Sequence, residues 1–259
     1  MQRIAVISDI HGNLPALEKA IEIIDQEAVD GIFACGDVVG YGDSPNECIE
    51  KLRELACPVV AGNHDWAVAG LTEYKKSHTE RAVRGIERTR AMLLEENLRW
   101  LQNLPLYHRE NGMEFVHASL TKADQWHYLT RRHSFTDTAW HDVQNNFSIM
   151  KGRVCFVGHS HLPTIFLQKR FGRIKFIHPQ SDSFELKGRR AIVDTGSVGL
   201  PRDLSAKPTL VIYDAKEQVV HFRQFTVEGQ NMHLIEAAGK PPSIWENTKR
   251  HVGRLMGAN

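Results

Sequence analysis

Three short apolar stretches near the start of the chain each run into a loop that holds aspartate, histidine or asparagine. Arg3–Ser8, Gly31–Cys35 and Pro58–Ala61 have the length and the residue types of buried strands. Between the first two, apolar residues recur at helical spacing from Leu14 to about Val29. Between the second and the third, Ser44-Pro45-Asn46-Glu47 matches a capping box and predicts a helix through Leu55. The order β-α-β-α-β predicts an α/β fold.

The rest of the chain changes from helical to strand patterns. We expect helix over Thr79–Leu104, with Gly85 as a weak point, and a hairpin turn at Asn111-Gly112 between Leu106–Glu110 and Met113–His117. Further elements are expected at Thr138–Ile149 (helix), Val154–Gly158, Thr164–Lys169, Ile174–His178, Arg189–Asp194, Thr209–Asp214, Val219–Phe225 (strands) and near Ile244–Leu255 (helix). Since no Pro/Gly/Ser-rich linker interrupts the pattern, we expect one domain over 1–259. Its core would span about 1–225 and its C-terminal extension about 226–259.

Potential metal ligands gather in the loops at the ends of the predicted strands. Each motif alone is common in polar loops, but here all of them fall in order at strand ends, where ligands of α/β sheets gather. Carboxylate, amide and imidazole donors without thiolate suit manganese, iron, zinc, nickel or cobalt better than calcium or a structural zinc site. They are too many for one ion, so we expect two sites that share a carboxylate. The loops hold Asp9, His11, Asp37, Asn63, His64, Asp65, His117, His159 and His161.

The same motifs carry a family resemblance. Asp9-Ile-His11-Gly12, Gly36-Asp37-Val-Val-Gly40, Gly62-Asn63-His64-Asp65 and Gly158-His159-Ser-His161 resemble the calcineurin-like metallophosphoesterases. The small bacterial and archaeal phosphodiesterase branch is similar in Gly36–Gly42 and in the late segment Asp194–Asp203. The resemblance implies an α/β, four-layer fold in which two mixed β-sheets pack as a sandwich flanked by helices. A dinuclear metal centre would lie at one edge.

The resemblance also implies roles for the ligand residues. One metal would be held by Asp9, His11, Asp37 and His161, and the other by Asp37, Asn63, His117 and His159. Asp37 would bridge the two. His64 would face the substrate as a catalytic group, with Asp65 orienting it, and Asn63, His64 and Arg202 would contact the substrate. Arg202 has the alternative of pairing with its neighbour Asp203.

The chemistry that follows is hydrolysis of a phosphate ester. Two divalent transition metal ions, manganese by preference, would activate a water molecule for in-line attack on phosphorus and neutralise the phosphoryl oxygens. An imidazole such as that of His64 titrates near pH 7 and can protonate the leaving oxygen. We expect a phosphodiesterase for a nucleotide, a dinucleotide or a nucleic-acid end.

Two other functions stay open from the sequence. The first is a phosphomonoesterase, either a nucleotidase or a Ser/Thr protein phosphatase, although the chain lacks the Asp-Arg-Gly and Gly-Asn-His-Glu of protein phosphatases. The second is a non-catalytic binding or scaffold module, because a fold alone does not give function. The histidines outside the motifs, His78 among them, match no pattern and are expected to be surface or hydrogen-bonded residues.

Composition limits where such a protein works. With 32 Lys+Arg against 31 Asp+Glu, bulk charge does not argue for nucleic-acid or membrane binding. The short apolar run before Asp9 fits neither a signal peptide nor a membrane helix. Four cysteines without C-x-x-C spacing fit a reducing compartment. We therefore expect a cytoplasmic protein without membrane contact, and a homo-oligomer is compatible with the sequence.

Overall fold

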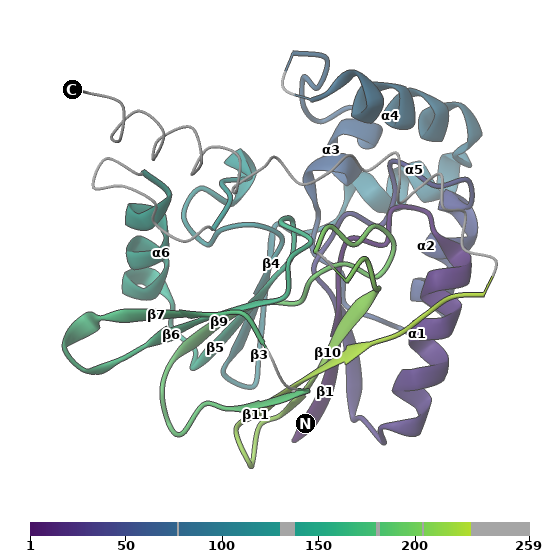
Figure 1. The fold of residues 1–259 in the computed structure, drawn as a ribbon. Helices are drawn as coiled ribbons and strands as arrows, with labels where there is room; N and C mark the ends of the chain where they lie inside the picture. Colours follow the sequence, from purple (N-terminus) through teal and green to yellow (C-terminus); the bar gives the residue numbers. More distant parts are fainter. Residues whose placement is uncertain (77, 130–137, 180–181, 204, 229–259) are drawn as a thin grey trace, which may run out of the picture.

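The strands form two mixed sheets that pack face to face (Figure 1). The computed structural model describes residues 1–76, 78–129, 138–179, 182–203 and 205–228. The first sheet has the order β2-β1-β10-β11-β8, from Gly31–Ala34, Arg3–Ile7, Thr209–Asp214, Val219–Gln224 and Ser183–Glu185. The second has the order β3-β4-β5-β9-β6-β7, from Tyr107–Glu110, Met113–Val116, Val154–Val157, Ala191–Asp194, Thr164–Gln168 and Ile174–Ile177.

Parallel pairing brings the ligand loops to one edge. β1 pairs in parallel with β2, and β4 pairs in parallel with β5. The carboxyl ends of the two strands in each pair therefore point the same way. The main chain also joins the two sheets there, since Val198 N donates to Ser8 O and Gly199 N to Asp9 O.

Three apolar clusters separate four layers, which confirms the predicted sandwich. One cluster packs α1 (Leu14–Gln26) and α2 (Pro45–Glu54) against the first sheet, and Figure 1 shows both helices on that flank. A second fills the space between the sheets, with Phe33, Phe115 and Phe156 in contact. The third packs α6 (Thr138–Ile149) on the other face of the second sheet. Within the described residues, no helix is both long and apolar enough to cross a membrane.

β1 shows how the sequence pattern builds these layers. Successive side chains of a strand point to opposite faces. Ile4 and Val6 accordingly lie in the cluster between the sheets, while Ala5 and Ile7 lie in the cluster under the helices. A strand buried on both faces needs the continuous apolar run that the sequence has here.

Two predicted elements are confirmed closely. The hairpin turns at Asn111-Gly112, where both residues have positive φ (49° and 76°), as a two-residue turn of this kind requires. The helix predicted at Thr138–Ile149 has those bounds. The closing helix predicted near Ile244–Leu255 lies outside the described residues.

The helical stretch predicted over Thr79–Leu104 is divided into α4 (Glu80–Met92) and α5 (Glu95–Gln102), and the weak point predicted at Gly85 lies inside α4. Asn46 of α2 explains the break. Its side chain donates to Met92 O and accepts from Leu94 N, both at 2.9 Å, and so bonds main-chain groups at the break. A contact from a distant helix thus ends α4, which local periodicity could not reveal.

Two smaller predictions also fail, and two elements were missed. Pro58–Ala61 forms no strand but a single bridge, Ala34 to Val59, because Ala61 N turns to donate to Pro105 O at 2.8 Å. Ser44 is the N-cap of α2, yet its side chain makes no capping hydrogen bond. The missed elements are β8 and α3 (Asn63–Ala69), and the first residues of α3 belong to a motif interpreted as a loop.

Candidate metal centre

The loops after β1, β2, β4 and β5, together with the first turn of α3, bring the predicted ligands into one buried cluster. All seven proposed ligands are at most 8% exposed. Six of them, together with His64, form overlapping groups whose donor atoms lie within 4.8 Å of one another, and so could hold metal ions. The groups are Asp9/His11/His161, His11/Asp37/His64 and Asp37/His117/His159.

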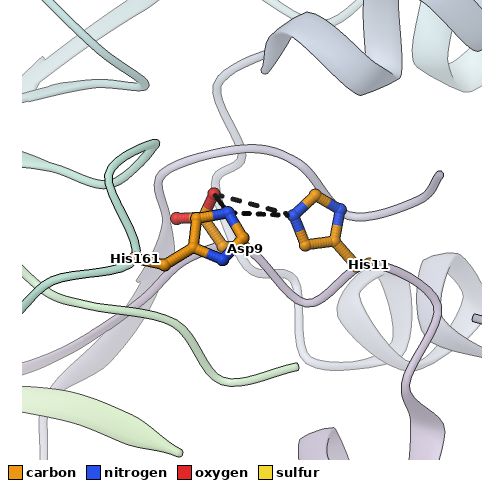
Figure 2. Close-up of side chains that lie close together, drawn as sticks. All are labelled: Asp9, His11 and His161. Atoms are coloured by element: carbon orange, nitrogen blue, oxygen red, sulfur yellow. Dashed lines mark hydrogen bonds and ion pairs between the residues drawn. The ribbon is translucent and has the colours of Figure 1, made fainter. Parts of the chain in front are cut away.

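The first group joins the two sheets (Figure 2). His161 Nε2 lies 3.2 Å from Asp9 Oδ1, and His11 Nε2 lies 3.9 Å from the same oxygen. The two Nε2 atoms are 3.2 Å apart. His11 Nδ1 donates to Val39 O, and His161 Nδ1 donates to Leu200 O. With both Nδ1 atoms protonated, two Nε2 lone pairs face each other, an arrangement that a cation between them would stabilise.

The second group is arranged in the same way around His117. Its Nδ1 donates to Cys35 O at 2.6 Å, so Nε2 is the ring nitrogen that faces the other donor atoms, and it becomes an acceptor once it gives up its proton. That Nε2 lies 3.2 Å from Asn63 Oδ1, 3.5 Å from Asp37 Oδ2 and 3.2 Å from His159 Nδ1. Acceptor atoms thus converge here as well, and a carboxylate, an amide oxygen and imidazoles form a suitable donor set for a divalent transition metal.

Asp37 belongs to both sides of the cluster. Its Oδ2 lies 3.7 Å from His11 Nε2 and 3.5 Å from His117 Nε2. Its Oδ1 accepts the main-chain N–H of His64 at 2.8 Å, which fixes the carboxylate plane. One oxygen atom therefore faces both ligand groups, as the predicted sharing of a carboxylate requires.

The cluster needs positive charge. Burial raises the pKa of Asp37, but His117 and His64 outweigh it and hold that pKa well below its usual range. Burial lowers the pKa of His117, yet Asp37, Asp9 and the Cys35 carbonyl together raise it to about 10. His159, by contrast, has its pKa lowered to about 3 by burial and by His117. The ionised carboxylates are thus balanced by a proton on His117, which a metal ion would displace.

Two buried atoms of the ligand set lack a hydrogen-bond partner. They are Asp9 Oδ1 and His159 Nε2. Leaving a buried polar group unpaired costs roughly 1–3 kcal/mol. The residues present therefore fit a metal-binding role, which would give the Asp9 oxygen a partner.

The main chain at the ligands is held in an unusual conformation. Asp9, His11, Asp37, His159 and His161 all have φ between 51° and 69°, a region that non-glycine residues rarely adopt. Such conformations cost about 1–3 kcal/mol each and cluster at functional sites. The surrounding hydrogen bonds keep them in place, for example Asp9 N to Gly36 O at 3.0 Å and His11 N to Asp37 O at 2.9 Å.

His64 lies at the edge of the cluster, and Asp65 does not contact its ring. The His64 ring packs 4.9 Å from that of His11, and its Nδ1 has no hydrogen-bond partner. Burial lowers the pKa of His64 to about 4. Asp65 was expected to orient His64, but its carboxylate instead accepts main-chain N–H groups of Val38, Val39 and Gly62, at 2.9–3.2 Å. Asp65 therefore fixes the loop that carries Asp37.

Arg202 lies near the His64 side of the cluster. Its positive charge lowers the pKa of His64 and acts on Tyr41, which packs 4.7 Å from the His64 ring. The alternative of pairing with Asp203 is not seen, since no ion pair joins the two among the described residues. Arg81 lies over the Tyr41 ring, with 5.0 Å from its guanidinium carbon to the ring centre.

Aromatic side chains from the segment after β4 border the cluster. Tyr128 stacks on His159 with 4.0 Å between ring centres, and it is 47% exposed. Trp126 contacts the rings of His117 and Trp66 edge-on. From the sequence, packing of an ordinary insertion was favoured for Trp126 and Tyr128 over the alternative that they roof the site and stack on a base, because only the tertiary fold brings the segment beside the ligand loops.

A buried cluster of carboxylates and imidazoles at the edge of a two-sheet sandwich is typical of a metal-dependent hydrolase. A family model for the calcineurin-like phosphoesterases matches residues 2–193, and the chain belongs to that family. This confirms the resemblance drawn from the motifs and shows that the protein is a phosphoesterase.

Relatives and solved structures agree with the family. An uncharacterized protein of Methanocaldococcus jannaschii is 37% identical over 218 residues, which cover 83% of each chain. Phosphodiesterase YfcE of Escherichia coli is 28% identical over 48% of this chain and 73% of its own. The crystal structure of a metallophosphoesterase from Sphaerobacter thermophilus superposes with a TM-score of 0.75 and 31% identity, covering 93% of this chain and 96% of that one.

Proposed function

We propose that the protein is a phosphodiesterase that uses two divalent transition metal ions, with manganese preferred among manganese, iron, nickel, cobalt and zinc. The position of Asp37 Oδ2 between His11 Nε2 and His117 Nε2 carries the proposal, because one oxygen faces two separate ligand groups. Asp9, His11, Asp37 and His161 would hold one ion. Asp37, Asn63, His117 and His159 would hold the other.

The chain's own residues supply the remaining steps. When bound, the two ions lower the pKa of a water molecule and neutralise the phosphoryl oxygens. His64 then protonates the leaving oxygen, since its ring packs beside that of His11 and one of its nitrogens belongs to a group with His11 and Asp37. The negative charge of a bound phosphate ester raises the pKa of His64 from the low value that burial imposes. Arg202 adds positive charge on the same side.

A nucleotide or dinucleotide is the substrate class that we propose. Tyr128 presents a half-exposed ring beside His159, where a base could stack. A symmetrical bis(5'-nucleosyl)-tetraphosphatase of Methylobacillus flagellatus is 32% identical over 46% of this chain, although the match spans only 43% of that protein. All four cysteines are free thiols, which supports the proposed cytoplasmic location.

Hydrolysis of bis-p-nitrophenyl phosphate beside p-nitrophenyl phosphate tests the function, with Mn²⁺, Ni²⁺, Co²⁺, Zn²⁺ and Mg²⁺ in turn. We expect transition-metal-dependent turnover of the diester, and a loss of about 100- to 10,000-fold in His64→Ala at unchanged metal content. His178→Ala, at an exposed histidine after β7, is the matched control. Turnover of the monoester alone would indicate a phosphomonoesterase. Two bound metals without any turnover would favour a binding module.

A further inference from the structure

His78 lies outside every motif, yet its ring reaches the candidate metal centre. It comes from the segment between α3 and α4. His78 Nε2 lies 3.0 Å from Asn63 Nδ2, and His78 Nδ1 lies 3.2 Å from Tyr74 O. The His78 ring also packs edge-on against His64, with 5.3 Å between ring centres. It is therefore in contact with both a proposed ligand and the proposed proton donor.

The direction of the hydrogen bonds follows from the chemistry of the partners. The Tyr74 carbonyl can only accept, so His78 Nδ1 carries the proton. In the neutral ring Nε2 then has the lone pair, and it accepts from Asn63 Nδ2. With the amide nitrogen committed to His78, Asn63 Oδ1 points the other way, where it lies 3.2 Å from His117 Nε2.

We propose that His78 is a positioning residue that holds the Asn63 side-chain oxygen toward the ligand group of His117 and Asp37. The proposal rests on the proposed function, since it takes Asn63 as a metal ligand. The two ends of an amide are nearly equal in shape, but only the oxygen can bind a cation. If the amide rotated by half a turn, N–H donors would face the ion. His78 favours the productive orientation because its Nε2 needs a donor.

Two substitutions at His78 separate positioning from simple packing. His78→Gln places an amide oxygen near the position of Nε2 and keeps an acceptor for Asn63 Nδ2. His78→Leu has a similar volume and removes the acceptor. Titration of metal-free protein with Mn²⁺ measures both binding steps. Since loss of a partner that orients a ligand costs about 10- to 100-fold in metal affinity, we expect His78→Leu to weaken one of the two sites by that factor. His78→Gln should stay within about threefold of wild type.

The matched control is His178→Leu, which removes an exposed imidazole far along the second sheet and should bind both ions as wild type does. Equal affinity of wild type and His78→Leu for both ions would overturn the proposal. Equal weakening in His78→Gln and His78→Leu would also overturn it, because packing rather than an acceptor would then matter. Thermal unfolding of each metal-free variant shows whether the fold is intact.

A second measurement needs no variant and no activity. The ¹⁵N shifts of the His78 ring in the metal-free protein, at a pH where the ring is neutral, report which nitrogen carries the proton. We expect protonation at Nδ1; protonation at Nε2 would contradict the proposal. The proposed function can fail separately. Wild type that binds two ions but hydrolyses no phosphodiester would refute the function and leave the role of His78 toward Asn63 intact.

Discussion

Main-chain carbonyls orient three of the four ring ligands of the candidate centre. His11, His117 and His161 donate their Nδ1 protons to the carbonyls of Val39, Cys35 and Leu200. A histidine ligand is commonly oriented by a carbonyl or a carboxylate at its second nitrogen. Here those carbonyls lie in the loops that border the cluster, so the folded main chain itself sets which nitrogen faces the metal.

Asp37→Asn tests the shared oxygen. An amide supplies one oxygen without charge, so it cannot serve both ligand groups as the carboxylate Oδ2 does. We expect Mn²⁺ affinity to fall by at least about 100-fold at both sites, above the loss that an orienting partner causes. Isothermal titration calorimetry measures it. The control is Asp43→Asn. Asp43 lies in the same loop as Asp37, is exposed and pairs with Arg88 of α4. Loss at only one site would show that Asp37 does not bridge.

At this scale the sequence predicts the ligands well and their surroundings poorly. Asp9, His11 and Asp37 follow predicted strands directly, so local pattern places them. His78 and Tyr128 reach the site only because their segments fold back over it. No spacing in the sequence distinguishes them from other polar and aromatic residues. The hydrogen bonds of Asp65 were likewise hidden, because they go to main-chain groups.

Among the secondary-structure elements, α3 is packed closely on the loop after β2. Gly62 precedes α3, and a Cβ there would lie closer than 3.0 Å to Asp37 N and to Asp37 Oδ1. Gly62 has φ −103°, which any residue can adopt, so only the close approach requires glycine. Gly62→Ala should therefore displace Asp37 or α3. We expect at least about 10-fold weaker metal binding.

The control for Gly62→Ala is Gly31→Ala, where the new Cβ would lie 3.0 Å from the flexible Met1 side chain and at an ordinary contact distance of 3.8 Å from Phe33. Metal titration of both variants measures their affinity for the ions, and thermal unfolding measures the stability of each fold. Should Gly62→Ala bind metal as wild type does, the loop must be able to move without cost, contrary to the packing described.

Glu27, at the end of α1, links that helix to two strands of the first sheet. Its carboxylate pairs with Arg3 of β1 and Arg223 of β11, each at 2.5 Å, and it is 16% exposed. The hydrogen bond from Arg223 is the main cause that lowers its pKa below 4.5. A lowered folded-state pKa stabilises the protein above the unfolded value, and this stabilisation is lost as pH falls through the folded-state pKa.

We therefore expect Glu27→Gln to reduce the free energy of unfolding by about 1 kcal/mol at pH 7, after allowance for solvent screening. The difference between the two proteins should shrink as pH falls below about 4.5 and vanish once Glu27 is protonated in both states. Urea unfolding at several pH values measures it. A difference that grows toward acid pH would contradict the assignment.

Helices, strands and turns were predicted correctly where a local sequence pattern determines them. They were missed where a contact from a distant residue determines where they begin or end. The hairpin at Asn111-Gly112 is encoded by two adjacent residues. The break between α4 and α5 depends on Asn46, which lies in another helix. β8 has a single apolar residue, Phe184, and forms through its pairing with β11.

Over the whole molecule, the candidate centre joins the two sheets. The first sheet supplies Asp9, His11 and Asp37, and the second supplies His117, His159 and His161. Metal binding should therefore stabilise the entire fold. At a free metal concentration of 100 times Kd, each ion adds about 2.7 kcal/mol. For a chain of this size that corresponds to a Tm higher by about 5–10 °C per ion.

Calorimetry of the protein before and after chelation, and after Mn²⁺ is restored, tests this expectation. Asp37→Asn in the same experiment should show a much smaller rise, because it lacks the shared ligand. An unchanged Tm in wild type would mean that the ions bind weakly or that the cluster does not tie the sheets together.

The left-handed main chain at five of the ligands limits how this centre could be transplanted. Grafting only the side chains onto another scaffold would give the right atoms on the wrong backbone, since an ordinary strand end turns its side chains elsewhere. The supporting carbonyls would be missing as well. The smallest unit that could be moved to another protein is thus the set of loops together with the strand pairs that hold them. Substitutions intended to change the substrate are better made at the residues that border the cluster, such as Tyr128 and Arg202.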